Sequence, residues 1–98
     1  MLTKMSAFFF MFYIYILYSD KFDRYYIDQT QDVNARLARH NAGREKSTSP
    51  YVPWKLIGFV EKASRAEAVI LESKLKNLNR ERLRIFVQKY CIEGRDEA

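Results

Sequence analysis

The sequence predicts an α+β fold in which a small, mostly antiparallel sheet is covered by helices. Two short apolar runs rich in Phe, Tyr and Ile, at residues 12–18 and 24–28, are joined by the polar segment "SDKFD", a pattern typical of a hairpin of two strands. A third apolar run, "WKLIGFVEK", lies between segments whose apolar residues recur at helical spacing. The predicted order of elements is therefore β-β-α-β-α-α.

Composition and charge place the chain among small globular proteins. Its 98 residues suffice for one domain and leave no room for a second independent core. Because 48% of the residues are hydrophobic, disorder of the whole chain is not expected. The 17 Lys and Arg against 12 Asp and Glu give a net charge of +5, which suits a polyanionic partner because phosphate contacts release counterions. Many basic proteins bind no nucleic acid, so charge alone does not assign this function.

Cysteine usage argues against stabilisation by disulfides or zinc. The single cysteine, Cys91, cannot form an internal disulfide, and the sequence has no CxxC motif or Cys/His cluster. A structural zinc site is therefore not expected, and a reducing, cytoplasmic compartment is the simplest context.

The N-terminal segment contains an apolar run of 12 residues, "AFFFMFYIYILY", that superficially resembles the core of a signal peptide. The run is too short to cross a bilayer as a helix, and no small-residue cleavage site follows it. Its Phe, Tyr and Ile content favours a buried strand. We therefore expect residues 1–10 to be a loosely ordered leader, and we expect no membrane association. The alternative, a membrane anchor formed by residues 1–18, would remove the first strand from the sheet.

The side chains of the first strand are expected to alternate between the two faces of the sheet. One face takes Tyr13, Tyr15 and Leu17, and the other takes Phe12, Ile14, Ile16 and Tyr18. No Asn-Gly or Asp-Gly pair indicates the type of the turn that follows. Tyr13 and Tyr15 are therefore expected to share one face with the apolar Leu17.

The first helix is predicted over "TQDVNARLARHNAG". Thr30 or Asp32 can cap its start, because a short polar side chain there accepts hydrogen bonds from free backbone N–H groups. Gly43 stands where a C-terminal cap belongs. A loop punctuated by two prolines then leads to the third strand.

Two further helices complete the domain. Ser64 and Glu67 have capping-box spacing at the start of "SRAEAVILESKLKNLN", and "RERLRIFVQKY" forms the last helical stretch. We therefore place the domain at residues 11–90 and expect residues 91–98 to be a frayed tail.

Arg36 and His40 are a candidate phosphate site. They lie four positions apart, so they share one face of the first helix. Arginine can bind a phosphate bidentately, and histidine can donate a hydrogen bond or carry a proton. The alternative interpretation is a solvent-exposed helix face with two polar residues.

Glu72 falls on the apolar flank of its helix, close to Ala68, Leu71 and Leu75 on a helical wheel. A carboxylate there must reach solvent, form an ion pair or hold a cation, because burial of an unpaired charge is costly. Mg²⁺ takes only one or two carboxylates and fills its other positions with water and phosphate oxygens, so a single glutamate can suffice. A metal site and an ion pair with Lys76 or an arginine are the two interpretations.

Tyr15 and Tyr26 lie on the two strands of the hairpin, where tyrosines are usually core or rim residues. A phenol titrates near pH ~10 and is a poor base unless neighbouring cations favour its phenolate. Arg36, Arg39 and lysines elsewhere in the chain can supply such cations.

Taken together, these motifs resemble the GIY-YIG endonuclease superfamily, in particular its small single-domain branch. "YIY" at 13–15 and "YID" at 26–28 are followed by the pattern Q-T-x-D-V-x-x-R-L-x-x-H-N, then by "STSPYVPWKL" and "AVILESKLK". The resemblance covers about residues 11–90. It implies a three-stranded antiparallel sheet flanked by helices, which agrees with the element order predicted above.

The resemblance also implies an activity, hydrolysis of phosphodiester bonds in DNA with one divalent ion, Mg²⁺ or Mn²⁺. By position, Tyr15 is the tyrosine of the first motif, Tyr26 that of the second, Arg36 the helix arginine and Glu72 the metal ligand. His40 is the residue one turn after the arginine. The implied reaction is in-line attack by water, with Tyr15 as general base and Tyr26 and His40 orienting groups or relaying the proton. Arg36 would neutralise the phosphate, and the ion on Glu72 would stabilise the leaving 3′-oxygen.

The sequence departs from the family pattern at several positions. Asp28 replaces the glycine that ends the second motif, which adds a negative charge near the expected phosphate. Aspartate reaches left-handed backbone geometry more readily than most residues, so it is compatible with a glycine-like conformation. Tyr13 replaces the first motif's glycine, and Gln29 stands where some members have lysine. Arg84 or Val87 occupies the place of a late active-site asparagine.

We therefore expect a DNA endonuclease that acts in repair or on branched or damaged DNA, without strong sequence recognition. The alternative is a nucleic-acid-binding module that has lost cleavage, which Asp28 and the missing asparagine favour. Contacts to the DNA backbone are expected from basic side chains whose default role is a solvated surface: Arg39, Arg44, Lys46, Lys55 and Lys76.

Overall fold

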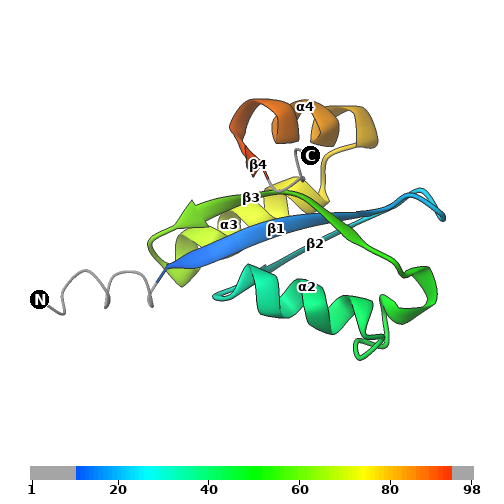
Figure 1. Ribbon diagram of the computed structural model, residues 1–98. Coiled ribbons are helices and arrows are strands. Elements are labelled where there is room, and N and C mark those ends of the chain that lie inside the picture. The colour runs from blue at the N-terminus through cyan, green and yellow to red at the C-terminus, as the bar shows by residue number, and fades with distance from the viewer. Residues whose placement is uncertain (1–10, 94–98) are drawn as a thin grey trace, which may run out of the picture.

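A computed structural model describes residues 11–93 as one twisted sheet with helices on both faces (Figure 1). The strands are β1 (Phe12–Ser19), β2 (Arg24–Thr30), β3 (Lys55–Lys62) and β4 (Ile92–Glu93). The helices are α2 (Val33–Asn41), α3 (Arg65–Lys76), α4 (Arg80–Tyr90) and a short 3₁₀ helix, η1 (Ser49–Tyr51). The strands follow the order β2-β1-β3-β4, and all neighbours are antiparallel.

The predicted α+β class and the order β-β-α-β-α-α are confirmed. The structure adds β4, which pairs with β3 through only two residue pairs, Gly58 with Glu93 and Phe59 with Ile92. Such a short pairing has no periodic signal in the sequence. The expected leader at residues 1–10 lies outside the described residues, as do the last five residues of the segment expected to be a tail.

Each face of the sheet has its own hydrophobic core, and β1 contributes to both. On one face Ile14 and Ile16 pack with β2 and with the helices α3 and α4, whose contributions are Ala68, Leu75 and Leu83. On the other face Tyr15 and Leu17 pack with Trp54 and with the apolar side chains of α2, Val33 and Leu37. Figure 1 shows this division, with α2 on one side of the sheet and α3 and α4 on the other. The predicted alternation along β1 is confirmed.

Polar side chains cap the three helices at their starts. Asp32 accepts a hydrogen bond from the backbone N–H of Ala35 at 3.0 Å, so Asp32 rather than Thr30 caps α2. Ser64 accepts from the N–H of Glu67 at 3.2 Å, as its capping-box spacing predicts. Asn79 caps α4 in the same way. Caps of this kind stabilise a helix by about 1 kcal/mol each.

Gly43 ends the α2 segment. Its backbone has a φ of 75°, in the left-handed region that glycine enters without a steric cost. Its N–H donates to the carbonyl of His40 at 3.0 Å, which turns the chain away from the helix directly after a candidate site residue.

Within residues 11–93, no helix combines the length and the apolar character that a membrane span requires. Within the apolar run that raised the question of a membrane anchor, residues 12–18 belong to β1, which lies in the middle of the sheet between β2 and β3. This position agrees with the expectation of a buried strand.

At Gly58, β3 lies close to Cys91, the residue that follows α4. A β-carbon at this position would lie 2.7 Å from the Cβ of Cys91 and 3.2 Å from its Sγ. We expect Gly58→Ala to lower the free energy of unfolding by about 1–3 kcal/mol, because neither strand nor helix end can move away freely. Urea unfolding followed by Trp54 fluorescence measures this loss, and adding Cys91→Gly should recover part of it. A Gly58→Ala protein as stable as the parent would contradict this packing.

Candidate active site

The candidate residues surround β2, the edge strand of the sheet, and fall on both of its faces. Tyr26 packs against the buried cluster of Tyr15, Leu17 and Trp54 on the face covered by α2. Gln29, three residues further along β2, points to the opposite face and bonds to Glu72 of α3. The site therefore has two parts, which we call the α2 side and the α3 side, and the backbone of β2 separates them.

A buried chain of hydrogen bonds forms the centre of the α2 side. The Tyr15 hydroxyl lies 2.9 Å from Nε2 of His40, and Nδ1 of His40 lies 2.8 Å from Oγ1 of Thr48. The Thr48 hydroxyl donates to the carbonyl of Glu45 at 3.4 Å, so its oxygen is left to accept from Nδ1. This pattern assigns the proton to Nδ1, and Nε2 then accepts the proton of the Tyr15 hydroxyl.

Both partners of this bond are neutral near pH 7. Burial lowers the pKa of His40, since an imidazolium would lose its hydration there. Burial, followed by the charge of Asp28, raises the pKa of Tyr15 to about 12. Nε2 of His40 is therefore the proton acceptor for the Tyr15 hydroxyl, although Tyr15 does not ionise by itself near pH 7.

Asp28 connects the remaining residues of the α2 side. Its Oδ2 accepts from the Tyr26 hydroxyl at 2.9 Å and lies 4.0 Å from Nη1 of Arg36, and its Oδ1 accepts from the N–H of Gln29 at 2.8 Å. Arg36 also donates weakly to the Tyr15 hydroxyl, at 3.5 Å. Burial and then the hydrogen bond to Asp28 raise the pKa of Tyr26. Asp28 thus holds Tyr26 as a neutral phenol and keeps Arg36 over Tyr15.

The backbone at Asp28 does not need the flexibility of glycine. Asp28 is an ordinary residue of β2 that pairs with Tyr15 of β1 in the strand register. Among residues 11–93, the non-glycine residue with a positive φ is Asp23, in the hairpin turn, at 54°. The idea that aspartate at position 28 stands in for glycine through a left-handed conformation is therefore wrong. What the substitution introduces is a carboxylate.

The α3 side is formed by Glu72 and the two residues that bind it. Glu72 follows the buried Ala68 by one turn, and its side chain is 15% exposed. One carboxylate oxygen, Oε1, accepts from Nε2 of Gln29 at 2.9 Å. The other, Oε2, pairs with Nζ of Lys76 at 2.8 Å. The ion pair with Lys76, one of the two interpretations of Glu72, is thus present.

The same residues fit a divalent ion that has few protein ligands. No group of three or more His, Cys, Asp or Glu suited to a metal occurs within residues 11–93, which excludes a full protein cage in this part of the chain. Glu72 nevertheless offers an oxygen beside the amide of Gln29, whose Oε1 is a buried acceptor without a hydrogen-bond partner among the described residues. Gln29 presents its Nε2 to Glu72, so its amide would have to turn over for Oε1 to join the carboxylate at an ion. Two such oxygens would leave room for water and phosphate, as Mg²⁺ prefers. An ion at Glu72 requires Lys76 to leave Oε2.

The basic residues expected to contact DNA fall into separate places. Arg39 and Arg44 line a hollow of about 610 Å³ together with Arg36, beside the outer face of α2. Lys76 lies at Glu72, as described above. Lys55 pairs with Asp20 at the hairpin end of the sheet, at 3.2 Å, and Lys46 is exposed in the loop before η1. The structure therefore groups the arginines of α2 and separates the lysines from them.

Thr48 is a site residue that sequence reasoning missed. It is almost fully buried, and the indole N–H of Trp54 donates to its carbonyl at 3.0 Å, which fixes the loop over His40. The only sequence signal is its position in the loop "STSPYVPW", and the sequence of this loop does not indicate whether its threonine is buried or exposed. Trp54 itself is held by Asn41, whose side chain bonds to both its N–H and its carbonyl.

Comparisons with known proteins identify the family of this domain. The family model of the GIY-YIG catalytic domain matches residues 11–85. A UPF0213 protein of Lacticaseibacillus paracasei is 32% identical over 85 residues, which cover 86% of this chain and 94% of that protein. A UPF0213 protein of Listeria welshimeri is 37% identical over 75 residues, covering 76% and 79% of the two chains. The solution NMR structure of the UPF0213 protein BH0048 from Bacillus halodurans superposes with a TM-score of 0.52 at 29% identity, over 80% of this chain and 83% of that one.

The chain belongs to the GIY-YIG family, a family of nucleases that generally use divalent metal ions. The similar UPF0213 proteins share most of its length, and their names state no specific function.

The pH dependence of folding tests the buried state of His40, the only histidine in the chain. Because its folded-state pKa is lowered, the unfolded chain binds the extra proton first when the pH falls below about 6.5. The contribution of His40 to the free energy of unfolding should therefore be constant above that pH and should decrease as the pH falls further. We expect His40→Gln to be less stable overall and to lack this component of the slope between about pH 7 and 5.5. Urea unfolding at a series of pH values measures both proteins, and equal slopes would contradict the assignment.

Proposed function

We propose that this protein is a divalent-metal-dependent endonuclease of the cytoplasm that hydrolyses phosphodiester bonds in DNA. We further propose Mg²⁺ or Mn²⁺ as its ion, and repair or processing of branched or damaged DNA as its role. The observation that supports this most directly is the buried chain Tyr15–His40–Thr48 beside the guanidinium of Arg36. It joins a proton acceptor to a phosphate-binding group, which hydrolysis of a phosphodiester needs together.

In the proposed reaction Tyr15 relays a proton and does not become an anion. An attacking water loses a proton to the Tyr15 oxygen while the Tyr15 hydroxyl gives its own proton to Nε2 of His40. A free phenolate with a pKa of about 12 is then never formed. The water oxygen forms the new bond to phosphorus as the bond to the 3′-oxygen breaks. Thr48 keeps the imidazole in the tautomer that this transfer requires.

Arg36 controls access to Tyr15, which is 0% exposed. Its guanidinium lies against the Tyr15 hydroxyl, although the Arg36 side chain as a whole is 33% exposed, and its ion pair with Asp28 is long, at 4.0 Å. A substrate phosphate would be a better partner, because it can accept two parallel hydrogen bonds. Movement of Arg36 from Asp28 to the phosphate would uncover the Tyr15 hydroxyl where the water must lie.

Glu72 and Gln29 are the residues that would hold the ion. A divalent ion supplies charge stabilisation at the phosphate and at the leaving oxygen when it is bound. Lys76 neutralises Glu72 in the absence of the ion, which keeps a mostly buried carboxylate from remaining unpaired.

A second candidate function is a nucleic-acid-binding module with impaired catalysis. Asp28 favours it, because its carboxylate occupies the partner position on Arg36 and holds the Tyr26 hydroxyl. A phosphate that approaches Arg36 must overcome the repulsion of this carboxylate. Asp28 would therefore have to be neutralised or displaced before the reaction, and this step would limit the rate.

Cleavage of labelled duplex, nicked and branched DNA with Mg²⁺ or Mn²⁺ tests the proposal. We expect the parent to cut and Glu72→Gln to lose activity by at least about 100-fold, because the ion loses its only charged protein ligand. Glu67→Gln is the matched control, since Glu67 is an exposed glutamate of the same helix, and it should cut like the parent. A parent that does not cut, beside an Asp28→Gly variant that does, would indicate a nuclease silenced by Asp28. Absence of cutting by both would favour the binding module.

The influence of Asp28 on the tyrosines is directly measurable. Asp28→Asn removes a charge that raises the pKa of both Tyr15 and Tyr26, so both phenols should ionise at lower pH than in the parent. Ultraviolet titration of tyrosinate measures the change, and Tyr15→Phe and Tyr26→Phe identify the two groups. Identical titration curves for parent and Asp28→Asn would show that the carboxylate does not act on these residues.

A further inference from the structure

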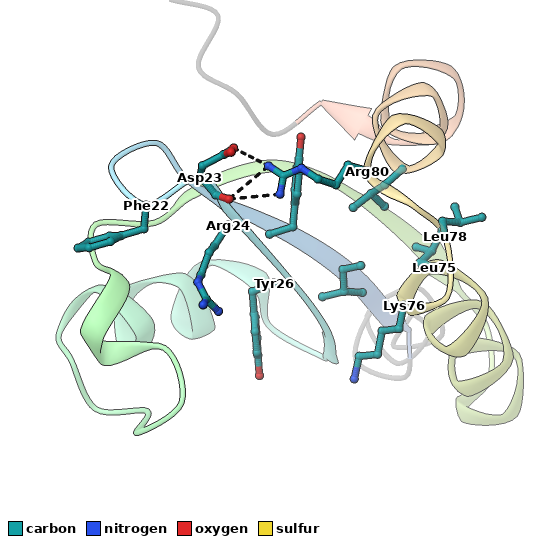
Figure 2. A pocket seen from close by; sticks show the side chains of 11 residues that line it. Phe22, Asp23, Arg24, Tyr26, Leu75, Lys76, Leu78 and Arg80 are labelled. Atoms are coloured by element: carbon teal, nitrogen blue, oxygen red, sulfur yellow. Dashed lines mark hydrogen bonds and ion pairs between the residues drawn. The ribbon is translucent and has the colours of Figure 1, made fainter.

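A pocket that the proposed reaction does not use opens beside the candidate site. Its volume is about 680 Å³, within the range of about 300–1,000 Å³ that is typical of ligand pockets. It lies between the hairpin turn with the start of β2 and the segment that joins α3 to α4 (Figure 2). Tyr26 and Lys76 line it, so the pocket adjoins one residue from each side of the candidate active site.

The charge of this pocket is mainly positive. Three cationic residues line it, Arg24, Lys76 and Arg80, against one acidic residue, Asp23. Figure 2 shows the side chains of Arg24 and Lys76 extending in the same direction, with Tyr26 between them. Within residues 11–93 Arg24 has no ion pair, and its guanidinium stacks on the Tyr51 ring with 4.2 Å to the centroid. A phosphate could therefore bind to it without displacing a carboxylate.

The pocket also offers apolar contact, which separates it from a simple phosphate site. Its lining includes the half-buried Leu78 and the buried core residues Leu75 and Leu83, and at its outer end Phe22 is 43% exposed. An exposed aromatic ring such as that of Phe22 can bind the face of a nucleobase. Base faces are accessible only where a strand is unpaired, because in a duplex they are stacked on each other.

The walls of the pocket are already in place before any ligand binds. The guanidinium of Arg80 donates to the carbonyl and the carboxylate of Asp23 and stacks over Tyr25, with 5.1 Å to the ring centroid. The Tyr18 hydroxyl donates to the same carboxylate at 2.7 Å. These contacts tie the hairpin turn to the start of α4, which lowers the conformational cost of binding a ligand between them.

We propose that this pocket binds an unpaired nucleic-acid segment next to the phosphodiester that is cut. The backbone phosphates lie at Arg24 and Lys76, and a base stacks on the exposed ring of Phe22. Lys76 would be free to bind a phosphate when an ion takes its place at Glu72. This assignment rests on the proposed nuclease function, and it gives the substrate class a physical basis, namely DNA with an unpaired strand at the cleavage point.

Binding of fluorescein-labelled DNA, followed by anisotropy with Ca²⁺ in place of Mg²⁺, tests the assignment separately from cleavage. The probes are a blunt hairpin duplex and the same duplex with a short oligo(dT) tail on its 5′ or 3′ end. The parent should bind one of the tailed probes at least about fivefold more tightly than the blunt probe. Phe22→Ala and Arg24→Gln should lose this preference, and Arg24→Lys should keep part of it.

Matched controls lie outside the pocket. Tyr90→Ala removes another exposed aromatic ring and Arg82→Gln another exposed arginine, and both should keep the preference. Thermal unfolding of each variant checks that the fold is intact. Equal binding of tailed and blunt probes by the parent would overturn the assignment, as would a preference that persists in Phe22→Ala and Arg24→Gln. If the parent shows the preference but cuts no DNA, the pocket is supported and the nuclease proposal fails. If the parent cuts DNA but shows no preference, the nuclease proposal is supported and the pocket assignment fails.

Discussion

The hydrogen bond between the Tyr15 hydroxyl and Nε2 of His40 connects the central strand of the sheet to the helix that covers it. Both residues are fully buried, so each polar atom must find a partner inside the protein. Tyr15 and His40 satisfy each other, and Thr48 satisfies the second ring nitrogen. The loop that supplies Thr48 is held by Trp54, which packs in the same core. Loss of one member would leave a buried polar group unpaired, which typically costs about 1–3 kcal/mol. The stability of this face and its chemistry therefore depend on the same atoms.

The position of β2 at the edge of the sheet explains how two different environments can meet in one site. On the α2 side the environment is enclosed and the tyrosines are neutral, whereas on the α3 side the carboxylate of Glu72 is charged and partly open to solvent. Because side chains alternate along a strand, Asp28 and Gln29 serve the two sides although they are neighbours in the chain. A central strand would be flanked by partners and could not expose this boundary to a large substrate.

The balance of charge is the second constraint on function. Arg36 and Lys76 each have a carboxylate partner from the protein itself, Asp28 and Glu72 respectively. These pairs neutralise the mostly buried carboxylate of Glu72 and the partly buried carboxylate of Asp28. In the proposed function, a substrate phosphate would be a stronger partner for either cation. Asp28 is the part of this balance that distinguishes the chain from the family pattern of glycine at that position. Its effect is electrostatic, since the strand geometry around it is ordinary.

The order of elements could be predicted from the amino-acid sequence, because apolar periodicity and capping residues act locally: the alternation along β1 and the cap at Ser64 both follow from neighbouring residues. Motif spacing also singled out Tyr15, Tyr26 and Glu72, although it left the surroundings of each open. Other contacts could be seen only in the folded chain: Thr48 completes the His40 site, Gln29 bonds to Glu72, and the hairpin turn and the start of α4 enclose a pocket. These contacts join residues distant along the chain or on different elements, and burial and pKa values follow from such contacts rather than from local pattern.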